Sequence, residues 1–402
     1  MLNSPIPKNE FDRIINLSEY DLDYSNLEDN FKDLARLAAN VAGTKISLVN
    51  LIDSFTQWSV SNYGLEIDQM PREDSVCQYT IMDNKPYEVA DLTADERFKD
   101  KFYVADDPKL RYYYGLPLTT SEGHNIGALC MLDKEIKTIS PEKTELLKII
   151  ANEIVNRLKA LKVINDLKGR LKEADETKRK VAHDIRGPLG GIIGLAQIIS
   201  EQGHTNQIDE VLEFINLIQK SGKSILELAD EILTAEETQK PKADEFNLEM
   251  LRDKLEQLYR PQERNKNIQF DISLSPETAK VPFSRTKLLQ ITGNLISNAM
   301  KFTPEGGRIG VSLVLQTKKD TPTLLQIKVS DSGVGMSAEA IEKIMGGTSG
   351  TTQGTDGEQG YGFGLALVKH LVTALKGTVT VTSKPGEGAT FEIHLPQLQV
   401  AQ

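Results

Sequence analysis

The sequence contains very little cysteine, with only Cys77 and Cys130 among its 402 residues. Two cysteines by themselves cannot supply a disulfide framework or a metal cage, and such sparse use fits the reducing environment of the cytosol. The simplest interpretation is that both are small, buried, apolar side chains. The composition therefore excludes a small disulfide-stabilised scaffold and a cysteine-ligated metal protein.

Long hydrophobic runs are missing as well. The nearest candidate, residues 190–199, is much shorter than the roughly 20 apolar residues that a membrane-spanning helix needs. The opening residues, MLNSP, lack the basic and apolar segments of a secretory signal. We therefore expect a cytoplasmic protein without a membrane span, which receives its signal inside the cell.

Basic residues are fewer than acidic residues. The chain has 47 Lys and Arg residues against 58 Asp and Glu residues, which gives a net charge of −11. This excess of acidic groups argues against nucleic acid or an anionic membrane as the main partner. The hydrophobic share of 39% and the charged share of 26% are ordinary for a soluble globular protein.

Helical and strand-like patterns follow one another in the first 140 residues. Apolar spacing predicts a helix over 10–42. Alternating apolar positions between turn signals predict strands at 45–53, 57–63, 87–91, 112–119 and 125–133. This order indicates an α+β domain with an antiparallel sheet.

A long helix is predicted from Ser140 onward, because apolar residues recur every three or four positions among many charged ones. It carries a coiled-coil seam and runs into the segment around His183. A break at 200–204 separates it from a second amphipathic helix over 211–233. Two such helices cannot bury their apolar faces alone, so we expect a homodimer with a four-helix bundle.

The segment KVAHDIRGPL places His183 beside Asp184 on the long helix. The apolar stripe that contains Ile185 and Leu189 points away from His183, so its imidazole is expected to face solvent. An imidazole with a carboxylate beside it can act as a nucleophile. An ordinary surface histidine is the alternative, and motifs further along the chain argue against it.

The run from Leu288 to Pro304 carries the first of these motifs. Asn294, Asn298 and Lys301 follow the spacing i, i+4, i+7, so two amides and one ammonium share a helical face. An amide oxygen suits Mg²⁺, and a lysine suits phosphate oxygens as a point charge. This face therefore predicts contacts with a metal ion and phosphates.

The second motif is DSGVG at 331–335. Asp331 falls at the end of a predicted buried strand face, where its carboxylate can accept a hydrogen bond from an exocyclic amine such as that of adenine. Gly333 and Gly335 let the backbone approach a flat ring closely.

The third motif is GYGFG at 360–364, which opens an apolar-periodic helix. Backbone N–H groups of such a turn, together with the helix dipole, form a cradle for phosphate. The spacing is GxGxG and no βαβ pattern precedes it, so a dinucleotide-binding fold is not indicated.

In this order, the motifs resemble those of the sensor histidine kinases over about residues 170–397. The segment GEGATFEIHLP at 386–396 matches the closing strand of that family. The resemblance implies that His183 accepts the γ-phosphoryl group of ATP and that Asp184 acts as its general base.

The same resemblance implies the nucleotide contacts and the cofactors ATP and Mg²⁺. Asn298 would coordinate Mg²⁺, Asn294 and Lys301 would contact the metal or the phosphates, and Asp331 would recognise adenine. The glycines that would frame the nucleotide are Gly333, Gly335, Gly360, Gly362 and Gly364.

The chain departs from related patterns at two positions. Related ATPases that hydrolyse to water carry a glutamate one helical turn before the metal-binding asparagine, where this chain has Asn294. The missing base favours transfer over hydrolysis. Family members that dephosphorylate their partner carry Thr or Asn four residues after the histidine. This chain has Gly187 there, which leaves a phosphatase activity open.

The N-terminal part resembles a GAF domain. The resemblance rests on QW at 57–58, MPREDSVC at 70–77, VADLTADERF at 89–98 and YYGLPL at 113–118. GAF domains bind small ligands or chromophores, or only dimerise. Cys77 is followed by Gln78 and not by the histidine of bilin-attaching relatives, so no bilin is expected.

The expected fold is therefore α+β and multidomain. It comprises a GAF-like sensor domain at 1–140, a coiled-coil signalling helix at 141–171, a dimerisation and phospho-acceptor domain at 172–238, a linker at 239–244 and an α/β-sandwich ATP-binding domain at 245–397.

The expected function is a histidine kinase that passes phosphate from His183 to an aspartate of a separate response regulator, since the chain shows no receiver domain of its own. Two alternatives remain. An ATPase switch or clamp would use the same nucleotide fold, but His183 and the absence of a glutamate at position 294 count against it. A non-catalytic dimeric scaffold would not need Asn298 or Asp331.

Overall fold

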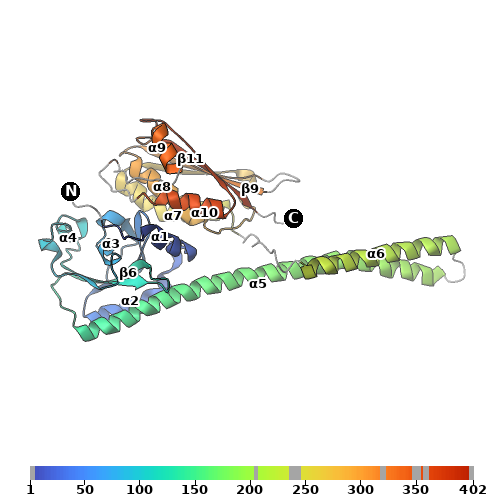
Figure 1. The fold of residues 1–402 in the computed structure, drawn as a ribbon, viewed down its shortest axis with the longest axis horizontal. Coiled ribbons are helices and arrows are strands. Elements are labelled where there is room, and N and C mark those ends of the chain that lie inside the picture. The colour runs from blue at the N-terminus through green and yellow to red at the C-terminus, as the bar shows by residue number, and fades with distance from the viewer. Residues whose placement is uncertain are drawn as a thin grey trace. The chain divides into compact units, whose positions relative to one another are not determined.

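The computed structural model describes residues 5–202, 207–234, 246–316, 323–345, 355 and 362–397. The chain divides into two compact units. One comprises residues 1–163 with 243–402, and the other comprises residues 164–242. The first unit contains an N-terminal α+β domain and a C-terminal α/β domain, and the second contains two long helical segments (Figure 1).

The N-terminal domain is built on a six-stranded sheet with the order β3-β2-β1-β6-β5-β4. All neighbouring strands pair antiparallel, which confirms the predicted antiparallel sheet. The strand β3 was not predicted, because its three residues include Pro71, and a proline within a short run argues against a strand. The strands are β1 (Ile46–Ile52), β2 (Thr56–Tyr63), β3 (Gln69–Pro71), β4 (Tyr87–Val89), β5 (Tyr112–Thr119) and β6 (Asn125–Asp133).

The predicted helix over 10–42 is two helices, α1 (Glu10–Glu19) and α2 (Glu28–Ala42), so the prediction is wrong between them. Asp21 adopts a left-handed backbone with φ of 47°. The Asp23 side chain accepts bonds from the N and Oγ of Ser25, and a short 3₁₀ helix, η1 (Tyr24–Asn26), follows. Such local bonds from an aspartate compete with a continuing helix.

Short helical segments complete the N-terminal domain. They are η2 (Arg72–Asp74), α3 (Cys77–Thr80), η3 (Leu92–Ala94) and α4 (Phe102–Ala105). The first turns of the long helix α5 (Pro141–Gln202) belong to the same hydrophobic core as α2, because Leu147, Ile154 and Leu158 are fully buried there.

A buried charge cluster joins three segments of this domain. Glu10 and Arg13 of α1 and Arg72 of η2 have exposed fractions of 1% or less. Arg13 Nη2 lies 2.8 Å and Arg72 Nη1 2.5 Å from Glu10 Oε1. Arg13 Nη1 also donates to the Ile52 carbonyl at 2.6 Å, and Arg72 Nη1 to the Asp53 carbonyl at 3.1 Å. The cluster therefore ties α1 and η2 to the end of β1.

The electrostatics of this cluster set its pH dependence. Burial alone would raise the pKa of Glu10, but the charges and hydrogen bonds of Arg13 and Arg72 outweigh it and lower the pKa from its ordinary 4.5 to about 2. A depressed carboxyl pKa contributes stability that is present above the ordinary value. That contribution is lost as the pH falls from 4.5 towards 2.

The C-terminal domain is a sheet covered on one face by helices. The strand order is β10-β11-β9-β8-β7. Only β7 and β8 pair in parallel, and the other neighbours are antiparallel. Alternate residues of β8 are buried, so one face of the sheet packs against the core. The strands are β7 (Gln269–Leu274), β8 (Arg308–Gln316), β9 (Thr323–Asp331), β10 (Thr378–Ser383) and β11 (Ala389–Gln397).

Three helices cover this sheet, namely α7 (Leu248–Lys266), α8 (Leu288–Phe302) and α10 (Gly364–Ala374). A 3₁₀ turn, η6 (Pro276–Thr278), follows β7, and the shorter helix α9 (Ala338–Met345) follows β9. Almost every residue of α8 is buried, although Asn294, Asn298 and Lys301 are polar. A helix that is buried all round and still carries polar groups indicates that those groups serve a site.

The second unit consists of α5 beyond residue 163 and α6 (Ile208–Thr234). Figure 1 shows α6 running back along the C-terminal part of α5. The continuous helix predicted from Ser140 is present, and Pro188 lies inside it. The predicted break at 200–204 falls partly outside the described residues. None of the described helices has the length and hydrophobicity of a membrane span.

Replacing Glu10 with glutamine tests the buried charge cluster. The change leaves two buried guanidinium groups without their carboxylate, so we expect the free energy of unfolding of the N-terminal domain to fall by about 3–5 kcal/mol. The chain has a single tryptophan, Trp58 of β2, which is 3% exposed. Its fluorescence during urea unfolding of the full chain therefore reports on this domain.

The matched control is Glu28→Gln, which removes an exposed ion pair with Lys32 and is expected to cost at most about 0.5 kcal/mol. The wild type should also lose stability more steeply than Glu10→Gln between pH 4.5 and 2. Equal acid sensitivity in the two proteins would contradict the role of Glu10.

Candidate nucleotide site

An open pocket of about 360 Å³, larger than the two other cavities described below, lies in the C-terminal domain. It is bounded by α8, the ends of β9 and β11, α9 and the first residues of α10. Of the residues singled out in the sequence, those that line it are Asn298, Lys301, Asp331, Gly335, Gly362 and Gly364. Segments that are far apart in the sequence thus meet in one cavity.

Asp331 is held at the end of β9 by backbone bonds. Its Oδ1 accepts from the Gly333 N–H at 2.9 Å and from the Ala389 N–H at 3.1 Å. Both of these bonds use the same oxygen, so Oδ2 is the one placed to accept an exocyclic amine. Burial raises the pKa of Asp331, although the two backbone donors oppose that shift.

The glycines around Asp331 permit a close approach of backbone segments. A Cβ on Gly333 would lie 2.2 Å from the Phe302 carbonyl oxygen, and one on Gly335 would lie 1.9 Å from the Lys384 carbonyl oxygen. Gly335 also has a left-handed backbone with φ of 65°. Only glycine avoids both the clash and the strain at this position.

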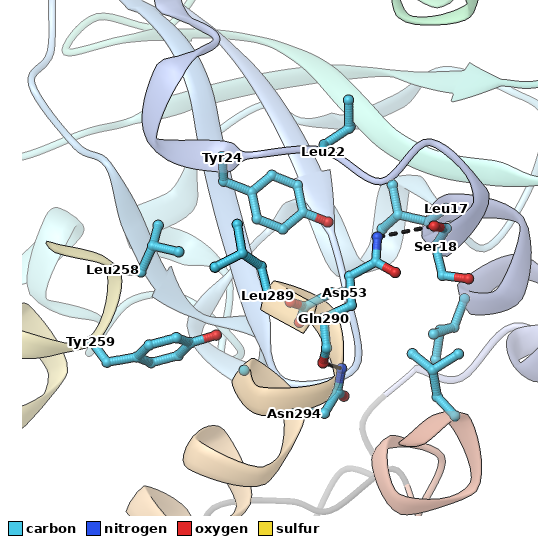
Figure 2. A pocket seen from close by; sticks show the side chains of 13 residues that line it. Leu17, Ser18, Leu22, Tyr24, Asp53, Leu258, Tyr259, Leu289, Gln290 and Asn294 are labelled. Atoms are coloured by element: carbon cyan, nitrogen blue, oxygen red, sulfur yellow. Dashed lines mark hydrogen bonds between the residues drawn. The ribbon is translucent and has the colours of Figure 1, made fainter. Parts of the chain in front are cut away.

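The polar residues of α8 divide between two cavities. Asn298 and Lys301, each 7% exposed, line the large pocket. Asn294 lines a second, smaller cavity of about 30 Å³, together with Gln290 and Tyr259, as Figure 2 shows. Its Nδ2 donates to the Gln290 carbonyl at 2.8 Å, and its Oδ1 has no hydrogen-bond partner among the described residues. The structure therefore brings two of the three predicted side chains into the pocket.

The glycine motif at 360–364 is described in part. Gly360 lies outside the described residues. Gly362 has a left-handed backbone with φ of 75°, and Gly364 is the first residue of α10. Gly362, Gly364 and Leu365 line the same pocket as Asn298 and Lys301, and the start of a helix is where backbone N–H groups can bind phosphate.

One residue of the pocket was missed by the sequence analysis. Phe55 lies in the turn between β1 and β2 of the N-terminal domain and still lines the large pocket. Its ring is so close to Gly364 that a Cβ there would lie 2.3 Å from Phe55 Cε2. No motif points to this residue, because its position depends on the packing of two segments that are distant in sequence.

The turn that carries Phe55 is fixed by Asp53. Asp53 Oδ1 accepts from the backbone N–H groups of Phe55 at 2.9 Å and Thr56 at 2.7 Å, and Oδ2 accepts from Trp58 Nε1 at 2.7 Å. Burial raises the pKa of Asp53, and these three donors oppose that shift. Arg72 N donates to the Phe55 carbonyl at 2.8 Å, which connects the turn to the buried charge cluster.

Other bonds join the N-terminal domain to α8. Lys287 N, just before α8, donates to Asp21 Oδ1 at 3.0 Å. Gln290 Nε2 donates to the Ser18 carbonyl at 3.0 Å, a bond drawn in Figure 2. Both acceptors lie at or just after the end of α1, in the segment where the predicted helix is interrupted.

Helix α7 and aromatic side chains extend this contact surface. Lys254 pairs with Asp23, and Gln69 Nε2 donates to the Leu258 carbonyl at 2.7 Å. The Trp58 and Tyr259 rings meet edge to face with centroids 6.0 Å apart. The Phe11 ring stacks on Phe363, just before α10, at 6.4 Å. The N-terminal domain therefore touches α7, α8 and the start of α10 together.

The predicted phospho-acceptor pair lies in the other unit. The backbone of His183 and Asp184 is helical within α5. Their side chains lie outside the described part of the chain, so their geometry stays a prediction.

The pocket fits a nucleotide with magnesium. No cluster of three His, Cys, Asp or Glu side chains that could hold a metal occurs among the described residues. Mg²⁺ bound together with a nucleotide does not need one, because phosphates and water supply most of its ligands. The Asn298 amide oxygen is a hard ligand of the required kind, and Lys301 lies one helical turn further on α8 to meet phosphate oxygens.

Two family models match the chain. Residues 179–240, which include His183, match the His Kinase A (phospho-acceptor) domain. Residues 284–399, which include α8 to β11, match the family described as histidine kinase-, DNA gyrase B- and HSP90-like ATPase.

Several curated proteins are similar over part of the chain. The autoinducer 2 sensor kinase/phosphatase LuxQ of Vibrio vulnificus is 34% identical over 224 residues, which is 54% of this chain and 26% of LuxQ. The histidine protein kinase DivJ of Caulobacter vibrioides is 31% identical over 231 residues, which is 54% of this chain and 36% of DivJ. A cyclic di-GMP phosphodiesterase of Pseudomonas aeruginosa is 31% identical over 225 residues, 53% of this chain and 38% of that protein.

The matched regions thus span well under half the length of these relatives. A phospho-acceptor domain followed by an ATPase domain is nevertheless the arrangement predicted from the motifs. Residues 179–240 and 284–399 thus match a phospho-acceptor domain and an ATPase domain of the histidine kinase type.

Replacing Asp331 with asparagine tests adenine recognition. An amide cannot offer the same charged acceptor, and a hydrogen bond to a charged group contributes about 1.5–3 kcal/mol. We expect the Kd for ATP to rise by roughly 10-fold to 100-fold with little change for GTP, as measured by calorimetric titration. The pKa of Asp331 is raised, so its carboxylate takes up a proton earlier than an ordinary aspartate as the pH is lowered. The loss of ATP binding on acidification should therefore begin at a higher pH than it would with an ordinary aspartate.

The control is Asp271→Asn, the same change at an exposed position of β7. It should leave both nucleotides unaffected. If Asp331→Asn binds ATP as the wild type does, adenine lies elsewhere.

Proposed function

We propose that the chain is an ATP-dependent protein histidine kinase that phosphorylates His183 and passes the phosphoryl group to an aspartate of a separate response regulator. The observation that carries this proposal is the convergence of Asn298, Lys301, Asp331 and Gly364 on one pocket in the ATPase domain. The phospho-acceptor match around His183 supplies the other reactant.

In the proposed reaction one ring nitrogen of His183 attacks the γ-phosphorus of ATP. A P–N bond forms, the P–O bond to ADP breaks, and Asp184 orients or deprotonates the second ring nitrogen. Bound Mg²⁺ would neutralise charge that develops on the phosphate oxygens. Asn298 would hold the metal, Lys301 would contact the phosphates, and the amides at the start of α10 would cradle them.

A homodimer is part of the proposal. Large apolar side chains on the second unit are exposed in the single chain, with exposed fractions of 45% for Leu189, 57% for Ile193, 54% for Leu212 and 49% for Ile215. Contiguous exposed apolar surface of this kind marks an interface. A second copy of the same helices would complete a four-helix bundle.

We assign the N-terminal domain, which resembles GAF domains, the control of the kinase. Its Phe55 ring lies against Gly364, where the N–H groups of α10 would meet phosphate. A ring and a phosphate group cannot share this position. Docking of the N-terminal domain on α10 and binding of ATP therefore oppose one another. By thermodynamic linkage, a signal that weakens this docking strengthens ATP binding.

Replacing His183 with glutamine tests the activity. The variant loses the nucleophile while the nucleotide pocket, which lies in another domain, stays intact. Incubation with γ-labelled ATP should give acid-labile protein label in the wild type and none in the variant, with unchanged ATP affinity.

His124→Gln, a change in a turn of the N-terminal domain, is the matched control and should label normally. Acid-labile label that persists in His183→Gln would remove His183 from its role. Release of free phosphate without any protein label in the wild type would favour the ATPase switch.

Replacing Phe55 with alanine tests the control. Truncating a packed aromatic residue at an interface commonly costs 2 kcal/mol or more. We expect ATP affinity and basal autophosphorylation to rise by roughly 10-fold. Phe102→Ala, a change of the same size at an exposed residue of α4, should alter neither quantity. An ATP affinity that falls or stays constant in Phe55→Ala would contradict competition between the ring and phosphate.

A further inference from the structure

The only two cysteines of the chain lie in contact with one another. Cys77 is the first residue of α3 and Cys130 lies on β6, and both are free thiols. Their sulfur atoms are 2.8 Å apart, and their exposed fractions are 3% and 0%. Their burial agrees with the interpretation as small apolar side chains, and the fold in addition places them side by side.

Polar groups surround the two sulfur atoms. Tyr113 Oη lies 3.3 Å from Cys77 Sγ and 3.4 Å from Cys130 Sγ. Asn50 Nδ2 donates to the same atoms at 3.3 and 3.6 Å. The Asn50 side chain is fully buried, and its Oδ1 has no hydrogen-bond partner among the described residues. A buried polar group without a partner beside two thiols indicates a site and not ordinary core packing.

A cavity gives small molecules access to this pair. Cys77, Cys130, Asn50 and Tyr113 all line a cavity of about 30 Å³ in the N-terminal domain, which is enough to hold one or two water-sized molecules. Leucine, isoleucine and methionine side chains form most of the remaining wall. The cavity therefore offers room for an uncharged reactant about the size of hydrogen peroxide and little attraction for an ion.

The two thiols differ in their electrostatics. Burial alone would raise the pKa of Cys77, but hydrogen bonds from Cys130, Tyr113, Asn50 and Ser75 outweigh it and lower the pKa. Burial raises the pKa of Cys130 well above its ordinary value. The thiolate is the nucleophilic form of cysteine. Cys77 is thus suited to react first, with Cys130 as the thiol that follows.

We propose that Cys77 and Cys130 are a reversible oxidation site that a small peroxide converts to an intradomain disulfide. The Cys77 thiolate attacks one peroxide oxygen, the O–O bond breaks, and Cys77 sulfenic acid forms with release of water or an alcohol. The Cys130 sulfur then attacks the Cys77 sulfur. An S–S bond forms and the sulfenic oxygen leaves as water, so two thiols and one hydrogen peroxide give one disulfide and two waters. A thiol reductant reverses the change by exchange.

The cysteine pair is connected to the nucleotide pocket through a short series of hydrogen bonds. The effect of oxidation on the kinase that follows from this connection rests on the proposed function. Ser75 Oγ accepts from Cys77 N at 2.9 Å, and Ser75 N donates to the Arg72 carbonyl at 3.1 Å. Arg72 in turn binds the Phe55 carbonyl and Glu10. A disulfide that joins Cys77 to Cys130 of β6 would shift Ser75 and Arg72, whose bonds hold the turn that carries Phe55. Oxidation then loosens docking and raises autophosphorylation.

The first experiment treats the full-length chain with increasing hydrogen peroxide, quenches it in denaturant and measures free thiols and intact mass. Both thiols should disappear together with loss of two hydrogens, and peptide mapping should join Cys77 to Cys130. Dithiothreitol should restore both thiols. Two thiols that stay free, a sulfinic acid, or cross-links between chains would overturn the proposal.

Variants separate the two roles. Cys130→Ala should leave a Cys77 sulfenic acid that dimedone traps, and Cys77→Ala should give no trapped adduct at Cys130. Tyr113→Phe removes a hydrogen bond from Cys77 and should slow the reaction about 10-fold. Equal dimedone labelling of both single variants would overturn the assignment of Cys77 as the reacting thiol.

Autophosphorylation of the oxidised and reduced wild type tests the connection separately. A severalfold higher rate after oxidation, absent in Cys130→Ala, is the expected result. If the disulfide forms while the rate stays constant, the connection to Phe55 is wrong and the oxidation site stands. If no state of the protein labels His183, the proposed kinase function fails, and the thiol measurements still decide the oxidation site.

Discussion

The buried carboxylate of Glu10 is the interaction on which the arrangement of the first unit depends. It binds Arg13 of its own helix and Arg72 of η2, and Arg72 also holds the carbonyl groups of Asp53 and Phe55. An unpaired charge at this depth would be very costly. Helix α1, η2 and the β1–β2 turn are therefore held together by one set of buried contacts. The same segments carry Ser18, which contacts α8, and Phe55, which contacts α10.

Close approach of backbone segments is the second constraint, and it acts on the nucleotide pocket. Asp331 is fixed by two backbone donors, and Gly388 allows this because a Cβ there would lie 1.9 Å from the Asp331 carbonyl oxygen. Gly364 has a different partner, since its missing side chain accommodates the Phe55 ring. In the proposed function, one glycine serves both a phosphate cradle and a docking surface, and competition between the two follows from this shared position.

The sequence was most informative where a local pattern decides the structure. The helical spacing of Asn298 and Lys301 and the strand parity of Asp331 predicted side chains that line the pocket. Five of the six strands of the N-terminal sheet were also found by alternation. The sequence was least informative where one residue reverses a local trend. The left-handed backbone of Asp21 and the side-chain bonds of Asp23 divide a segment whose apolar spacing is that of a single helix.

Residues whose role depends on distant packing could not be predicted at all. Phe55 is an unremarkable turn residue until the N-terminal domain meets α10, and Asn294 shares a helical repeat with Asn298 yet lines a different cavity. The contact of Cys77 with Cys130 likewise depends on the sheet register. Cys130 of β6 pairs with Gly115 of β5 on one side and with Leu48 of β1 on the other.

Hydrogen–deuterium exchange of the full chain, with and without Mg²⁺ and a non-hydrolysable ATP analogue, tests the central claim that nucleotide and the N-terminal domain compete. We expect slower exchange at 331–335 together with faster exchange at 18–24 and 53–56. Slower exchange at 331–335 with unchanged or slower exchange at 53–56 would contradict it, because the nucleotide would then bind with Phe55 still in place.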